Sequence, residues 1–496
     1  MLPSPAPSTN SSASACATPS SLAIGSDPRT QPADLLLTAA ATDFSFLTEL
    51  VSPETTILSA PTFEPEIGLG WVTFPGTDQT LPSPPLLNKL IDVFFASQAS
   101  LYTGLIYESR FRQAMLLPPS HARYPPPVLL HAVVLSAGRT VSSDFWAGEF
   151  PYWGTSTPLE FHRDQIISKI DACFGERVNT ITIVQAAVLL CCSVYIDADF
   201  GRIFLLCSTA VRACIPAGLN HLRKASVKNG IFSDRFHASR TCIGPTSDPE
   251  ELSERAMAFW FARACDLFAS ASTSWSGAIV DDDISTAIPA LDGSFPADEF
   301  ELAGSTLSIH HPAFFTSHPP HLCGPVQMMF KSLALLGKVG EYQHSIPPPF
   351  GLAMNKPPAF LCPNTTPEFA KLDRLIEQFQ QSLPRAYHAF EAGSAVDSRV
   401  SLVFSVAHVA GILLHEPYAT SAPGDPSFVA CQQAARAIFG SILSLWTGSY
   451  DLARSAPFCC YTWAVAASKS ALSTGLGCSA RGAEANMCCC FRDLHT

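Results

Sequence analysis

The stretch DPEELSERAMAFWFARACDLFAS, residues 248–270, decides the fold because it joins a helix start signal to a long helical pattern. Asp248 can serve as the N-cap, Pro249 as the first helical residue and Glu251 as the reciprocal partner of a capping box. Apolar residues then recur at helical spacing on one face: Ala256, Phe259, Trp260, Ala264, Leu267 and Phe268. The pattern predicts an amphipathic helix over 248–268 that packs against a core.

The stretch SWSGAIVDDDISTAIP, residues 274–289, follows this helix and reads as a small-residue turn and an acidic loop that ends at Pro289. Asp281, Asp282 and Asp283 could hold a hard cation through carboxylate oxygens. A loop of solvated acids is the favoured interpretation.

Helical patterns recur along the rest of the chain, separated by proline-rich and polar stretches. Residues 180–196 are apolar nearly all round, which predicts a central buried helix. Further helices are expected at 87–95, 102–115, 128–137, 161–174, 202–214, 326–336, 366–383, 400–414 and 428–445. No hairpin signal and no fixed-period repeat is evident, so the fold class is all-α, with a large multi-helix domain over 84–475.

Composition restricts the function classes. The chain has 496 residues, 15% of them charged, and a net charge of −12. It contains no run of four Lys or Arg residues, so direct DNA binding by this chain is poorly supported. The N-terminus lacks a signal peptide, and the apolar stretches 183–196 and 402–414 fall short of the roughly 18–20 residues of a membrane span. We expect a soluble, intracellular chain without a membrane partner.

Both ends of the chain differ from the expected domain. Residues 1–83 are rich in Ser, Thr and Pro and are expected to be disordered, while 476–496 form an atypical Cys-rich tail. Within the first region, 34–51 alternates acids with bulky apolar groups, as amphipathic activation segments do. The candidate activation residues are Asp43, Phe44, Phe46, Leu47 and Val51. A short docked helix and a plain linker remain alternatives.

Candidate sites for chemistry are weak. The chain has 17 cysteines but no C-x-x-C pair, and Cys191, Cys192, Cys207, Cys214 and Cys265 lie in apolar helical patterns. A group of His310, His311, His318, His321 and Cys323 could bind a metal, but a proline-rich exposed loop is the favoured interpretation. Arg212 is expected to pair with a buried carboxylate such as Asp266. No nucleophile elbow, metalloprotease motif or P-loop occurs, so we do not expect an enzyme.

The order of these parts resembles the regulatory, or middle homology, domain of fungal binuclear zinc-cluster transcription factors. In that family a helix with an acidic start leads to Phe-Trp, an Asp, a small-residue turn and an Asp-Ile-x-x-x-x-Pro loop, as at 248–289 here. Four further segments match in order: 87–111, the helix pair 184–221 with its Gly-Leu-x-His end, 369–384 with its Ser-Leu-Pro end, and 415–438.

The resemblance implies a nuclear regulator of RNA polymerase II transcription. Its expected partners are transcription coactivators or a related transcription factor, and a small-molecule effector is conceivable. The family binds DNA through a six-cysteine zinc module, a repeated Cys-x2-Cys-x6-Cys cluster. Cys16 is the sole cysteine before Cys173 in this chain, so no zinc or other cofactor is expected in it, and DNA would be reached indirectly. The alternative is a helical protein-interaction adaptor that acts through a full-length partner.

Overall fold

The computed structural model describes residues 78–473, except 79, 98–101, 103, 147–156, 176–179, 198, 223–226, 229–230, 233–240, 297–298, 346–365, 389–396, 421–423 and 448–454. Three predictions concern residues wholly or mostly outside this part of the chain. These are the expected disordered region 1–83, of which only 78 and 80–83 are described, the candidate activation segment 34–51, with Asp43, Phe44, Phe46, Leu47 and Val51, and the tail 476–496.

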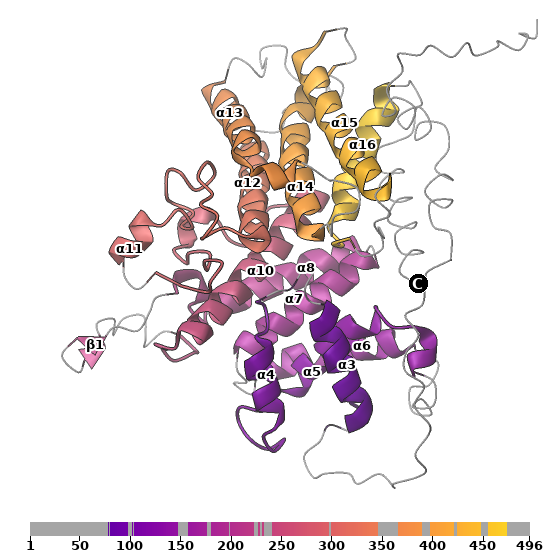
Figure 1. The fold of residues 1–496 in the computed structure, drawn as a ribbon, viewed down its shortest axis with the longest axis vertical. Coiled ribbons are helices and arrows are strands. Elements are labelled where there is room, and N and C mark those ends of the chain that lie inside the picture. The colour runs from indigo at the N-terminus through magenta and orange to yellow at the C-terminus, as the bar shows by residue number, and fades with distance from the viewer. Residues whose placement is uncertain are drawn as a thin grey trace, which may run out of the picture.

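The fold is all-α, as the sequence predicts (Figure 1). Its helices are α3 Pro84–Ser97, α4 Glu108–Met115, α5 Pro127–Gly138, α6 Pro158–Gly175, α7 Thr180–Ile196, α8 Phe200–Cys214, α10 Pro249–Thr273, α11 Glu299–Gly304, α12 Pro325–Ser345, α13 Pro367–Ser382, α14 Ser398–His415, α15 Pro426–Thr447 and α16 Cys459–Ser473. A short antiparallel pair, β1 Val227–Lys228 with β2 Ile231–Phe232, was not predicted; β1 lies at the periphery in Figure 1.

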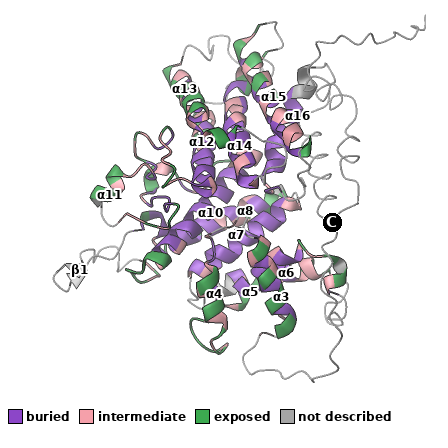
Figure 2. Cartoon of the chain, in the orientation of Figure 1, coloured by how far each residue is buried: buried purple, intermediate pink, exposed green. Residues whose placement is uncertain are grey.

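Helix α10 lies at the centre and contacts α7, α8 and α12 (Figure 2). Its start confirms part of the predicted cap, because the Asp248 carboxylate accepts the Glu250 N–H at 3.1 Å and Pro249 is the first helical residue. The predicted capping box, in which Glu251 would bond back to Asp248, does not form. The Glu251 carboxylate instead accepts bonds from Arg255 and from the Thr246 hydroxyl, whose oxygen also takes the Asp248 N–H.

The amphipathic interpretation of this helix is also incomplete. The predicted stripe is buried, with Trp260 at 1% exposure, but so is nearly every residue from Leu252 to Ala269. Helices pack against α10 from several sides, so its polar positions must find partners inside the protein. A pattern of residues in one helix cannot report how many neighbours will surround it.

Three other helices show where the sequence succeeds and fails. Helix α7 begins and ends as predicted and is buried nearly all round. The segments 398–418 and 426–447 are long and apolar enough to cross a membrane by length and composition, so the argument from the short stretch 402–414 is wrong. In the structure, 67% of the most apolar 18-residue stretch of 398–418 is buried within the protein. The corresponding share for 426–447 is 39%.

One continuous hydrophobic core runs from Leu86 in α3 to Ala467 in α16. Helix α16 was not predicted, and residues at and just before its start reach the central helix. There the ring of Phe458 stacks on Phe268 of α10 with centroids 4.0 Å apart. The core thus ties the C-terminal helices to α10, whose C-terminal end carries the candidate site.

Candidate functional site

The end of α8 and the acidic loop after α10 lie side by side. Gly218 takes a φ of +70° and starts a short 3-10 turn, Leu219–His221. The Asn220 carbonyl accepts the N–H groups of Ser285 and Thr286 at 2.9 and 3.1 Å. The Asn220 amide donates to the Asp283 carbonyl at 2.9 Å. Two segments that the sequence analysis singled out separately therefore form one structural unit.

The hydroxyl of Thr286 completes this connection. It donates to the Leu219 carbonyl at 2.5 Å and accepts the Leu222 N–H at 2.8 Å, and Thr286 is buried. Gly218 is required beneath it, because a Cβ at this position would come within 2.6 Å of Thr241 and the φ favours glycine. The loop is thus held in one register against the end of α8.

A buried ion cluster holds the other side of the loop. The Arg263 guanidinium donates to Asp266 at 3.0 Å and to Asp281 at 3.3 Å, and Lys338 of α12 donates to Asp281 at 3.0 Å. Both Asp266 oxygens accept the Ala278 N–H, at 3.0 and 3.1 Å. We call Arg263, Asp266, Asp281 and Lys338 the ion clasp; it joins α10, the loop and α12.

The ion clasp corrects two predictions. Arg212 is exposed, and the ion-pair partner of Asp266 is Arg263, three residues earlier on the same helix. That i, i+3 spacing was visible in the sequence and is the signal that could have found the pair. The acids of the loop are solvated at Asp282 and Asp283, whereas the Asp281 side chain is only 13% exposed and bound to two cations.

Burial sets the electrostatics of the clasp. Desolvation raises the pKa of Asp266 above its usual 3.8, and the Arg263 charge and the Ala278 N–H oppose that shift. Desolvation, followed by the charge of Asp281, raises the pKa of nearby Glu341. Two cations face two carboxylates, the buried Asp266 and the partly buried Asp281, so the charges of the clasp cancel and both carboxylates already have cationic partners. This arrangement favours a structural latch over a cation site.

The histidine-rich loop does not come together as a metal site. Among the described residues, no three His, Cys, Asp or Glu side chains are placed to hold a metal ion. The His310 ring lies 2.7 Å from the Ile284 carbonyl, and the His311 ring accepts the Ala313 N–H. His318 faces a different part of the protein, toward Lys331 and Ser382.

The side chains of Lys331, His318 and Ser382 form a hydrogen-bonded series that was not predicted. It resembles a catalytic relay, but the positions of its protons do not fit one. Lys331 is fully buried and can only donate, so its contact of 3.3 Å makes His318 Nδ1 an acceptor. The ring proton then lies on Nε2 and is donated to the Ser382 hydroxyl at 3.0 Å. Ser382 in turn donates to the Phe379 carbonyl at 2.9 Å.

His318 therefore has no free lone pair with which to take a proton from Ser382. Desolvation and the Lys331 charge lower the pKa of His318 to about 4, which keeps the ring neutral. Desolvation lowers the pKa of Lys331 to about 8. The relay fixes the end of α13 on α12 and does not activate a nucleophile.

Comparisons of the chain with protein-family models, with curated proteins and with solved structures find no match.

Proposed function

We propose that this chain is a transcriptional regulator of the fungal zinc-cluster type, whose helical body is a regulatory domain acting on RNA polymerase II transcription in the nucleus. The observation that carries the proposal is the contact between residues 218–222 and 283–286. Both segments carry the resemblance, and they meet although they are distant in sequence.

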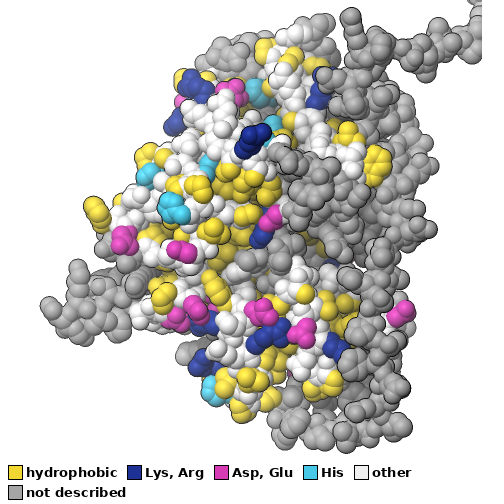
Figure 3. Space-filling view, in the orientation of Figure 1, with side chains coloured by type: hydrophobic (Ala, Val, Ile, Leu, Met, Phe, Trp, Pro, Cys, Tyr) yellow, Lys and Arg dark blue, Asp and Glu magenta, His cyan; other side chains and the backbone are white. Residues whose placement is uncertain are grey.

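The distribution of charge supports an indirect route to DNA. The chain has 30 Lys and Arg against 42 Asp and Glu residues. On the face drawn in Figure 3, the basic side chains are scattered and interleaved with acids. Nucleic-acid binders gather basic residues on one face. In this proposal DNA recognition comes from a partner that carries the zinc module, and transcription coactivators are the other partners.

The proposed output segment is 34–51. Its acids keep the neighbouring apolar side chains in water, so these groups stay available to a coactivator groove. Phe44, Leu47 and Val51 are spaced i, i+3, i+7 and would form the docking stripe of a helix formed on contact.

A reporter assay tests the proposal. Residues 34–51 fused to an unrelated DNA-binding domain should activate transcription, and the Phe44→Ala/Leu47→Ala double variant should abolish the signal. Ser45→Ala is the matched control and should change it little. A silent fusion, or a double variant that stays active, would contradict the activation role and leave 34–51 as a linker or a docked helix.

The second candidate function is an adaptor that acts by pairing with a full-length relative. The acidic net charge of −12 agrees with this role as well as with the first, because both reach DNA through a partner. Both roles reach DNA through a partner, so chromatin occupancy should depend on a co-expressed partner in either case, and the 34–51 fusion separates them. Occupancy that depends on the partner while the 34–51 fusion stays silent indicates the adaptor, and an active fusion indicates the regulator.

A further inference from the structure

Exposed apolar side chains gather along the junction of α8 with the acidic loop after α10. Among the described residues, nine large hydrophobic side chains are exposed, and four of them belong to these two segments. We call these four the apolar strip: Leu205 and Ile215 of α8 with Trp275 and Val280 of the loop, each 45–67% exposed. Exposed apolar side chains gathered in one place indicate an interaction site, whereas single ones are normal on any surface.

The two segments meet at both ends, so the loop runs parallel to α8. At the first end, the rings of Phe204 and Trp275 meet edge to face with centroids 4.7 Å apart. At the second end, the turn that follows α8 bonds to residues 283–286 of the loop. Leu205 therefore lies at the level of Trp275, and Ile215 lies toward the acidic end of the loop.

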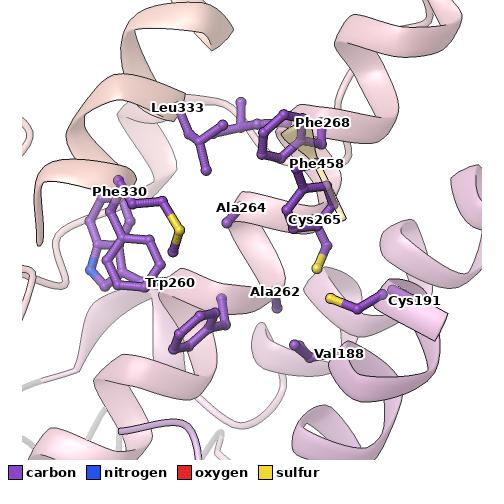
Figure 4. Packing of buried hydrophobic residues seen from close by; sticks show 14 of the residues in the cluster. Val188, Cys191, Trp260, Ala262, Ala264, Cys265, Phe268, Phe330, Leu333 and Phe458 are labelled. Atoms are coloured by element: carbon purple, nitrogen blue, oxygen red, sulfur yellow. The ribbon is translucent and has the colours of Figure 1, made fainter. Parts of the chain in front are cut away.

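The protein beneath the apolar strip is firmly packed. Figure 4 shows two side chains of α10 turned into the core, Cys265 toward Cys191 of α7 and Phe268 against Phe458. The loop that leaves this helix is held by the ion clasp and by the hydroxyl of Thr286. A partner therefore meets a preformed surface, and little conformational entropy is lost when it docks.

Exposed charges of opposite sign lie on the two sides of the strip. On the helix side, Arg212 is exposed between the two apolar residues of α8, and Arg202 pairs with Asp199 at 3.4 Å. On the loop side, Asp282 and Asp283 are both exposed. The strip thus has an apolar centre, a basic helix edge and an acidic loop edge, which is the layout of a protein interface with a charged rim.

We propose that the apolar strip is the interface of a homodimer, in which a second copy docks through the same strip about a two-fold axis parallel to α8. This axis lays the helix edge of each copy over the loop edge of the other, so opposite charges meet twice. An axis across the strip would instead set helix edge on helix edge and bring like charges together.

The register of the two segments selects the contacts of this dimer. Leu205 packs on Trp275 of the partner subunit, because both lie at the same level of the strip. Desolvation raises the pKa of Asp266 and the charge of Arg212 is among those that oppose the shift, which places Arg212 near the middle of the loop. Asp282 is the nearer of the two exposed acids along the loop, so Arg212 pairs with Asp282 of the partner subunit.

A second copy fits the strip better than the candidate segment 34–51 does. The charged residues of that segment are Asp34, Asp43 and Glu49, with no basic residue, so it complements the helix edge alone. A second copy complements both edges. The strip extends only about 15 Å from Leu205 to Ile215, at 1.5 Å per residue, so the dimer should be weak and exchange with the monomer. This inference does not depend on the proposed function.

Sedimentation of the purified full chain over a range of concentrations tests the dimer. We expect the mass to rise from monomer to dimer as the concentration increases. Arg212→Glu and Asp282→Lys should each raise the dissociation constant about tenfold or more, because like charges then meet twice. An equimolar mixture of the two variants should regain the dimer, because each reversed charge then faces an opposite one.

The apolar centre has its own matched pair of variants. Leu205→Glu should abolish the dimer, whereas Leu116→Glu, at an exposed leucine that follows α4, should leave the dissociation constant unchanged. Circular dichroism checks that each variant is folded. If Arg212→Glu fails to fold, the comparison of Leu205→Glu with Leu116→Glu still decides.

Three results would overturn the proposal. A wild-type chain that stays monomeric at every concentration leaves the strip to segment 34–51 or to a different partner. A dimer that persists in Leu205→Glu uses another surface. A mixture of Arg212→Glu with Asp282→Lys that stays monomeric shows that these two side chains do not face each other across a two-fold axis.

Discussion

Replacing Arg263 with methionine should lower the free energy of unfolding by about 3–5 kcal/mol, the cost of breaking a buried ion pair by removing one partner. Arg263 is 3% exposed and Asp266 is fully buried, so water cannot replace the lost charge. Methionine keeps much of the apolar volume, which leaves the charge as the main change. Among the described contacts, Asp266 then keeps only the Ala278 N–H.

A second change should relieve this charge. In the Arg263→Met/Asp266→Asn double variant, the side chain at 266 is neutral and its carbonyl can still accept the Ala278 N–H. Its new amide lies one turn from Ser270, whose buried hydroxyl has no partner among the described residues. We expect the double variant to recover about 1–2 kcal/mol relative to Arg263→Met, roughly one satisfied hydrogen bond and a removed charge.

The pH dependence has a definite sign. Burial raises the pKa of Asp266 above 3.8 in the folded protein, so its contribution to stability is present below that value and is lost as the pH rises through the folded pKa. Without Arg263 the folded pKa rises further. The loss of unfolding free energy caused by Arg263→Met should therefore become smaller as the pH falls from neutral toward 3.8.

Urea unfolding followed by circular dichroism between neutral and acidic pH measures these effects. The control is Arg112→Ala, which breaks exposed ion pairs with Glu108 and Asp92 and should cost about 0–1 kcal/mol. If Arg263→Met costs no more than this control, or its deficit is the same at every pH, Asp266 is not held as a buried charge and the reasoning fails.

Three further predictions concern packing and metal content. Trp260→Ala should lower the free energy of unfolding by about 3–5 kcal/mol. Trp260→Phe should cost under about 1.5 kcal/mol, because the buried indole N–H has no partner in the described part of the chain. Equal thermal midpoints for the two variants would place this face of the helix in solvent. Gly440→Ala should raise the free energy of unfolding by about 0.5–1 kcal/mol, since nothing lies within 4 Å of the added Cβ. Gly337→Ala should lower it by about 1–3 kcal/mol, because the added Cβ comes within 2.5 Å of Leu267. Urea unfolding should therefore give changes of opposite sign for the two variants. Elemental analysis of the purified chain should find no stoichiometric zinc, because its cysteines lack ligand spacing, and one or two tightly held zinc ions per chain would contradict this.

Helices were predictable from the sequence where periodicity and end signals coincide. Pro249 stands first in its helix, as predicted, and the helix predicted over 366–383 begins at Pro367. Helix α16 was missed because its first residues, Cys459-Cys460, carry neither a cap nor a clear stripe. Its position is decided by contacts such as that of Phe458 with Phe268, which a local pattern does not contain.

The candidate site was predictable in its parts and not in its assembly. The acidic loop and the Gly-Leu-x-His segment were both identified, but their pairing depends on hydrogen bonds between residues more than sixty positions apart. Asp281 was predicted to be solvated together with the other acids of the loop. Its partners, Arg263 and Lys338, come from two other elements and bury it.

This assembly decides which experiments can test function. Asn220, Thr286 and Asp281 all hold the loop in place, so replacing any of them removes buried bonds and destabilises the body. A loss of activity in such a variant would follow equally from a regulator, an adaptor or an enzyme that had unfolded. Segment 34–51 can be transferred to another protein without the body, so its result does not depend on the stability of the core. The reporter fusion therefore separates function from folding, and variants of the ion clasp do not.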